Sequence, residues 1–414
     1  MTTHPLDSLT ADEINKAVDL YRAYDVSDEN TLFINVTLVE PSKEFVRSYK
    51  EGEEFDRTVK IVGVDSNPDG GFVASIDLKK EQVTALERLP NEAQAAYSFA
   101  EVGLATVLTK QNKEYQDALK KRDVTNLDLV QIDPWPAGGV VHESIKPGHR
   151  AMRTISFLKE NETDNAYAKP IQGVISHVDL TLKEVTCVED FGVVPVPKAH
   201  ARYDAESQSE FREQPKPIEI TQPEGAGFEV EGNQISWEGW QLRASIHPVE
   251  GPVLHQVSLN ERPILHRASL SDMVVPYGSA DPMHSWKAVH DGTEYGFGNL
   301  TNSLTLGCDC VGEIHYLDAN ILTFDGSVNF IENAICIHEE DFGIQWKHTD
   351  FNNFIPTEVR RSRRLVVSSI STIGNYDYGM FWYLYLDGTI QAVSYTHLRA
   401  HETDSYLVCR LLLE

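Results

Sequence analysis

The first hydrophobic pattern along the chain is that of an amphipathic helix. Its apolar positions recur at a spacing of three or four residues and are Ile14, Ala17, Val18 and Tyr21. Thr10 and Glu13 stand just before this pattern with the spacing of a capping box, in which each side chain binds the backbone N–H of the other residue. The pattern predicts a helix that begins just after Thr10 and buries one face.

Strand patterns follow this helix. Apolar and polar residues alternate over 31–40, 57–65 and 71–78, and turn residues such as those of the stretch DSNPDGG separate the runs. A helix followed by short alternating strands is typical of an α+β unit in which the helix covers an antiparallel sheet. We therefore expect a small α+β domain over residues 1–95.

This unit recurs. Residues 76–89 align without a gap on residues 178–191, with Asp77 over Asp179. A helical pattern and then a strand pattern precede the second copy, as they do the first. Because the order and the phase are both preserved, we interpret residues 96–200 as a second α+β domain that arose by duplication.

Helical periodicity disappears after residue 200. Residues 201–227 are polar, acidic and rich in proline, which is typical of a linker. From residue 228 the chain alternates and turns repeatedly, and Gly232-Asn233 gives a hairpin signal. The predicted fold class is α+β followed by all-β, with part of a large antiparallel β-sandwich over residues 228–393.

Charge and composition exclude several classes of partner. The 414 residues carry a formal net charge of −27, which repels phosphate backbones and anionic lipid surfaces, so we expect no nucleic acid and no membrane as a main partner. The sequence shows neither a signal peptide nor an apolar run long enough to span a bilayer. These patterns favour a cytoplasmic location.

Four blocks in the same order resemble the copper amine oxidase family. They are MVVPYG (273–278), CDCVGEI (308–314), ICIHEED (335–341) and TIGNYDYG (372–379). The linker and the start of the sandwich also match the family in order, and the resemblance runs from the first helix to about Val393. It implies two cystatin-like α+β domains before the sandwich, a homodimer, and a peroxisomal location if the source is a eukaryote.

The resemblance also implies a reaction. The family uses copper(II) and topaquinone to convert a primary amine, oxygen and water to an aldehyde, ammonia and hydrogen peroxide. Tyr376 would be the topaquinone precursor, which forms a Schiff base with the substrate amine, and Asp291 stands where the family places the proton acceptor. A carboxylate suits that role if desolvation raises its pKa. Tyr277, Asn375 and Asp377 would hold the ring in position.

The residues by themselves also permit a structural interpretation. Tyrosines on half-buried strands are favoured for packing, and an aspartate before Gly292 is common in turns. The alternative function is therefore a non-catalytic β-sandwich that binds a partner. Val289 stands where many family members carry an aromatic gate, so the amine preference stays open.

The five cysteines are too sparse for a disulfide scaffold and lack the paired CxxC spacing of a zinc site. By resemblance, Cys310 and Cys336 form a disulfide. Free buried thiols are the usual state in an intracellular protein, so the redox state of this pair stays open.

The resemblance fails at the copper ligands. The family binds copper with three histidines downstream of the quinone tyrosine, and two of them form a His-x-His pair on one strand face. None of the fifteen histidines forms such a pair, so we expect no metal ligands in this chain. Residues 394–414 no longer resemble the family and are predicted to be a non-native tail. We therefore expect the chain as written to be inactive, because Tyr376 needs copper for its conversion.

Overall fold

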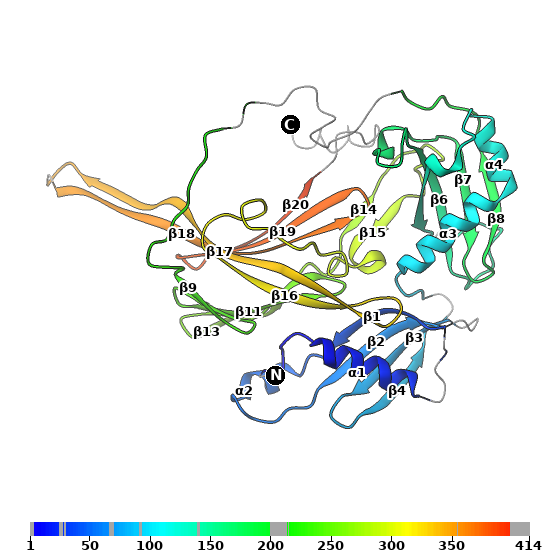
Figure 1. Ribbon diagram of the computed structural model, residues 1–414. Coiled ribbons are helices and arrows are strands. Elements are labelled where there is room, and N and C mark those ends of the chain that lie inside the picture. Colours follow the sequence, from blue (N-terminus) through cyan, green and yellow to red (C-terminus); the bar gives the residue numbers. More distant parts are fainter. Residues whose placement is uncertain are drawn as a thin grey trace.

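The computed structural model describes residues 4–24, 28, 30–65, 70–90, 93–138, 141–198, 213, 215–353 and 355–397. Two α+β units are followed by a larger β-sandwich, and both units lie against it (Figure 1). Within these residues, no helix is both long and apolar enough to cross a membrane.

The first unit has one main helix on a four-stranded sheet. Its elements are α1 (Ala11–Arg22), β1 (Leu32–Leu38), α2 (Lys43–Ser48), β2 (Thr58–Val64), β3 (Gly71–Asp77) and β4 (Gln82–Arg88), and the strands lie in chain order. The capping box of Thr10 and Glu13 is present, and the predicted apolar face of α1 is buried against the sheet. The helix prediction is confirmed.

The second unit repeats this plan with two consecutive helices. Its elements are α3 (Phe99–Gln111), α4 (Lys113–Lys120), β5 (Val130–Pro136), β6 (Ala151–Leu158), β7 (Val174–Asp179) and β8 (Glu184–Asp190), with the short 3₁₀ helices η1 (Leu127–Leu129) and η2 (Ala166–Ala168). The helices cover one face of the sheet β5-β6-β7-β8. The other face packs towards the sandwich through Ile155, Ile175 and Met283.

The two units share local detail at the aligned positions. A register shift falls between Ser75 and Ile76 in the first hairpin and between His177 and Val178 in the second. The hairpin turns contain Glu81 and Lys183, which both adopt a positive φ. Because a bulge and a left-handed turn residue recur at equivalent places, the geometry supports the proposed duplication.

The third unit is a sandwich of two five-stranded antiparallel sheets. One sheet contains β9 (Phe228–Glu231), β10 (Gln234–Trp237), β11 (Trp240–His247), β12 (Gly251–Leu259) and β13 (Arg262–Ala268). The other contains β16 (Ile314–Leu322), β17 (Val328–Asp350), β18 (Ile355–Ile373), β19 (Tyr376–Tyr385) and β20 (Ile390–His397). Trp237, Trp240, Ile337 and Leu384 are buried between the two sheets. A short ribbon of β14 (Val274–Pro276) and β15 (Ala288–His290) stands beside them.

The hairpin of β17 and β18 extends well beyond the rest of the sandwich (Figure 1). We call its outer part, residues 341–361 except 354, the arm. Large apolar side chains are exposed along it: Phe342, Ile344, Trp346, Phe351, Ile355 and Val359.

Strand β20 continues past residue 393, where we expected the native sequence to end. Residues 394–397 pair with β19 in the register of the preceding residues. Residues 398–414, which make up most of the predicted non-native tail, lie outside the described residues. In the predicted linker, residues 213 and 215–221 are exposed.

Candidate active site

A cavity of about 440 Å³ lies between the second α+β unit and the sandwich. The second unit contributes residues of β5 and β6 to its wall. The sandwich contributes residues of the ribbon, the turn before β19 and β19 itself. Four of the residues expected at the site line this cavity, and they are Tyr277, Asp291, Asn375 and Tyr376.

Tyr376 begins β19 directly after a tight turn. Gly374 in that turn has a φ of +59°, a conformation that favours glycine, and Asn375 behind it is buried. The hydroxyl oxygens of Tyr376 and Tyr277 lie 2.8 Å apart. This hydrogen bond restrains the orientation of both rings, and the role of Tyr277 in positioning a quinone stays a prediction.

Asp291 lines the same cavity and is hydrogen-bonded there to Tyr378. The Tyr378 hydroxyl donates a hydrogen bond of 2.6 Å to Oδ2 of Asp291. Tyr376 and Tyr378 are two positions apart on β19, so their side chains share one face of the sheet, and their ring centroids are 6.2 Å apart. The candidate base and the candidate quinone precursor therefore face a common space.

The environment of Asp291 raises its pKa. The residue is 5% exposed, and this burial is the main cause because it disfavours the charged carboxylate. The hydrogen bond from Tyr378 and the nearby His290 lower the pKa, whereas the charge of Asp272 raises it, and the net direction is upward. Such a group can take up a proton more readily than an ordinary aspartate.

Asp272 holds the turn that presents Asp291. Its Oδ1 accepts hydrogen bonds from the backbone N–H groups of Gly292 and Thr293, and its Oδ2 lies 3.0 Å from Nδ1 of His290. The turn is a short π-helical segment, η4 (Asp291–Tyr295). We did not predict this role for Asp272, because nothing near Asp272 in the sequence marks its approach to the turn.

Asp377 lies apart from the other predicted site residues. Its Oδ1 accepts a hydrogen bond of 2.7 Å from the Thr372 hydroxyl, and Asp377 does not line the cavity. Strand alternation directs its side chain to the face opposite that of Tyr376 and Tyr378. Any influence of Asp377 on the ring would pass through the turn between β18 and β19.

The second unit supplies a wall that the sequence analysis missed. The Trp135 ring packs edge-on against the Tyr277 ring with centroids 5.6 Å apart, and Lys287 Nζ lies 4.5 Å from the centroid of Trp135. Asp133 lies on the same face of β5, and burial raises its pKa. The Asp-Pro-Trp sequence at residues 133–135 was visible, but only the packing of the two units brings it to the site.

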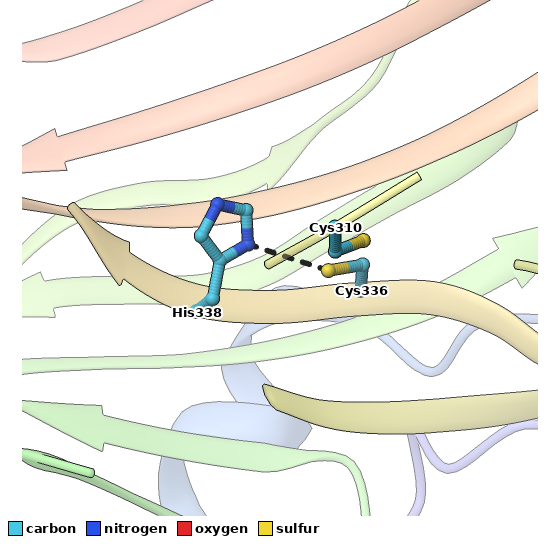
Figure 2. Close-up of side chains that lie close together, drawn as sticks. All are labelled: Cys310, Cys336 and His338. Carbon is cyan, nitrogen blue, oxygen red and sulfur yellow. Dashed lines mark hydrogen bonds between the residues drawn. The ribbon is translucent and has the colours of Figure 1, made fainter. Parts of the chain in front are cut away.

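Cys310 and Cys336 lie side by side in the core as free thiols (Figure 2). Sγ of Cys336 is 3.3 Å from Nδ1 of His338, which follows two positions later on β17. The structure therefore has the reduced pair where the resemblance implied a disulfide, and the disulfide stays a prediction.

Metal-binding groups in the described part of the chain lie away from the cavity. Two clusters have at least three donor side chains close enough to share an ion, namely Cys310, Cys336 and His338, and His142, His177 and Glu189. None of these residues lines the cavity. The described residues thus do not fit the three-histidine copper site that the resemblance places beside Tyr376.

Comparison with family models identifies three regions of one family. The model for the copper amine oxidase enzyme domain matches residues 229–396. The models for its N3 and N2 domains match residues 100–208 and 4–88.

Curated relatives agree with these matches. The chain is 41% identical over 393 residues to a primary amine oxidase, also named copper methylamine oxidase, of Arthrobacter sp. (strain P1). It is 40% identical over 395 residues to a histamine oxidase of Arthrobacter globiformis. Each match covers 94% of this chain, but 60% and 57% of the respective relative.

Among solved structures, a copper-containing benzylamine oxidase from Hansenula polymorpha has a similar fold. The TM-score is 0.84 at 24% sequence identity, and the match covers 95% of this chain and 64% of that protein. The chain therefore spans roughly three fifths of the length of the proteins it resembles.

Proposed function

Because the chain belongs to the copper amine oxidase family, we propose that it carries the amine-binding half of a primary-amine oxidase site. The reaction would convert a primary amine, oxygen and water to an aldehyde, ammonia and hydrogen peroxide. The observation that supports this most is that Tyr376 and Asp291 line one cavity, linked through Tyr378.

The surroundings of Tyr376 fit a topaquinone derived from its ring. When present, this quinone supplies an electrophilic carbonyl that reacts with an amine and accepts two electrons from it. Tyr277 is within hydrogen-bonding distance of the phenolic oxygen and fixes the position of the ring. Buried Asn375 supports the ring from the preceding turn.

Asp291 is the proposed proton acceptor. It removes a proton from the substrate carbon next to the nitrogen, and burial has already raised its affinity for that proton. Tyr378 holds the carboxylate in place through its hydroxyl. Positioning and desolvation together give the carboxylate its role as a base.

The walls of the cavity favour an amine with an apolar tail. Aromatic and aliphatic side chains dominate its lining, among them Trp135, Phe157, Tyr295 and Met283. Such walls exclude water from the reacting carbon and contact an apolar tail. Val289 also lines the cavity and is small, so it leaves more room than an aromatic side chain would.

The described residues do not offer the three-histidine ligand set for copper beside Tyr376. The test therefore uses a chimera. The part of the Arthrobacter methylamine oxidase that follows its match to this chain is joined to the end of that match, and the chimera is compared with this chain. With aerobic Cu(II), the chimera should form a phenylhydrazine adduct of the quinone and release peroxide with a primary amine. The chimera with Tyr376→Phe should form no adduct, and an adduct in that variant would contradict the assignment.

We also propose that the protein is a homodimer in which the arm contacts a second copy. The arm exposes Trp346 and Phe351 at 49% and 81%, far from the core of its own sandwich. Monomeric proteins rarely expose so many apolar side chains along one element, and an interface is the usual explanation.

A cytoplasmic or peroxisomal location is proposed too, and the names of tobacco relatives include the word peroxisomal.

A further inference from the structure

Two histidines and a glutamate meet at the edge of the second unit, away from the candidate active site. His177 lies on β7, Glu189 on β8, and His142 in the segment between β5 and β6. One ligand atom from each residue lies within 4.8 Å of the other two. The imidazole rings of His142 and His177 are stacked with centroids 4.1 Å apart.

His177 is the least explained member of this cluster. Its side chain is 2% exposed, and its Nε2 lies 2.7 Å from Oε2 of Glu189. Its Nδ1 is buried and has no hydrogen-bond partner among the described residues. A buried ring nitrogen without a hydrogen-bond partner destabilises the folded protein, unless a group or an ion outside the described residues binds it.

The other two members provide access and orientation. The Glu189 side chain is 31% exposed, so the cluster opens to solvent on that side. His142 Nδ1 accepts a hydrogen bond of 3.1 Å from the backbone N–H of Ser144 and lies 2.8 Å from the Ser144 hydroxyl, and these contacts orient the ring. Ser144 is in turn fixed by Thr186 on β8, with hydroxyl oxygens 2.8 Å apart.

We propose that His142, His177 and Glu189 form a structural site for a first-row divalent cation such as Zn²⁺. Two imidazoles and one carboxylate are the borderline donor set that such ions prefer. A bound ion would tie the His142 segment to β7 and β8. The charge of −27 on the chain draws cations towards the protein in general.

The positive charge of Arg153 faces the cluster. Arg153 lies opposite His177 on β6, and its guanidinium stacks over the Trp286 ring at 4.9 Å. This charge opposes cation binding and sets an upper limit to the affinity. Through its contact with Trp286, Arg153 also links the cluster to the face of the second unit that packs on the sandwich, where the Trp286 ring packs against the Trp135 ring.

Zinc titration calorimetry on the whole chain, in a reducing buffer, tests the proposal. Wild type should bind one Zn²⁺ that His142→Ala and Glu189→Gln each bind at least tenfold more weakly. The matched control is His149→Ala, since His149 lies in the same unit and pairs with Asp179 outside the cluster. This control should bind Zn²⁺ as wild type does.

The thiol cluster of Cys310, Cys336 and His338 is the competing site, and cobalt distinguishes the two. Co²⁺ held by imidazole and carboxylate lacks the near-ultraviolet charge-transfer band that thiolate ligation produces. Equal zinc affinity in His142→Ala and wild type, or a cobalt spectrum with the thiolate band that disappears in Cys310→Ser, would overturn the proposal. The assay needs neither copper nor amine, so its result is independent of the proposed oxidase activity.

Discussion

At the scale of single residues, the contact between Asp291 and Tyr378 balances two requirements of the proposed base. Burial raises the pKa of the carboxylate, so it binds a proton more tightly. The hydroxyl of Tyr378 stabilises the charged form, which must be present before the carboxylate can accept a proton. The pKa of Asp291 is raised in spite of this hydrogen bond, so the burial of the carboxylate dominates.

Replacing Tyr378 should move the pH dependence of amine oxidation. In Tyr378→Phe the carboxylate loses its donor, so the pKa of Asp291 rises further. Because the base acts only when deprotonated, the acid limb of the kcat/KM profile of the chimera should shift to higher pH. Tyr277→Phe is the control, since Tyr277 contacts Tyr376 instead of Asp291 and the limb should stay in place. A limb that is unmoved in Tyr378→Phe would contradict the assignment.

Removing the charge of Asp291 should lower activity and raise stability. In the chimera, Asp291→Asn should reduce the kcat of amine oxidation by a factor on the order of 10² to 10⁴. The folded protein binds this proton more tightly than the unfolded chain, so the wild type loses stability as pH rises from the ordinary aspartate pKa through the raised one.

At neutral pH, Asp291→Asn should therefore be more stable than wild type by roughly 0.5–2 kcal/mol. Urea unfolding of the present chain measures this, and the difference should shrink when the pH is brought below the ordinary aspartate pKa. A less stable variant at pH 7 would show that the carboxylate is not strained by burial.

At the scale of elements, both α+β units fasten their helix to the sheet in the same way. An arginine just before the second strand binds the capping-box glutamate of the helix, as Arg57 does with Glu13 and Arg150 with Glu101. The carbonyl of each arginine also accepts a hydrogen bond from the residue after the third strand, Leu78 or Leu180. One arginine thus joins the start of the helix, through its side chain, to the ends of two inner strands, through its backbone.

Loss of the arginine should destabilise the second unit. The Arg150 and Glu101 side chains are 8% and 6% exposed, so Arg150→Ala leaves a buried carboxylate unpaired and should cost about 3–5 kcal/mol. Hydrogen exchange should show the loss first in α3 and β6. Lys120→Ala breaks the exposed pair with Asp117 and should cost at most about 0.5 kcal/mol. Equal effects of the two changes would refute this role for Arg150.

Local patterns in the sequence predicted most of these elements. The helix at Thr10, the repeated hairpin and the sandwich strands follow from periodicity and turn residues, which act over a few positions. The proximity of Asp291 to Tyr378 and of Trp135 to Tyr277 depends on how distant elements pack. The family resemblance supplied the expectation for Asp291, whereas nothing supplied it for Trp135 or Asp272.

At the scale of the whole molecule, the arm and the described part of the linker are two exposed segments. The arm carries apolar side chains into solvent, and the described part of the linker carries exposed residues between the second unit and the sandwich. The two segments lead to separate predictions, one on association and one on cleavage.

Association should depend on the apolar residues of the arm. Light scattering after gel filtration should give twice the chain mass for wild type and the single chain mass for Trp346→Ser/Phe351→Ser. Val193→Ser is the matched control, since Val193 is also exposed but lies outside the arm. A wild type of single mass, or a double variant that stays dimeric with unchanged circular dichroism, would exclude the arm contact.

Brief proteolysis should cut the chain within residues 201–227. The α+β units have buried cores and hydrogen-bonded sheets, which resist cleavage, whereas residues 215–221 are exposed and irregular. Mass spectrometry should find fragments that end in this region. Fragments distributed evenly over the sequence would argue against independent folding of the two units.

The cavity has walls from two units, the second α+β unit and the sandwich, and the two contribute different kinds of residue. The sandwich holds the groups proposed for chemistry, while strands β5 and β6 of the second unit shape the space around the substrate tail. Substitutions in the second unit can therefore alter which amines enter while Tyr376 and Asp291 stay undisturbed. Mutations in the second unit could therefore change the selectivity for amines, in nature or by design, without changing the residues of the sandwich proposed to carry out the reaction.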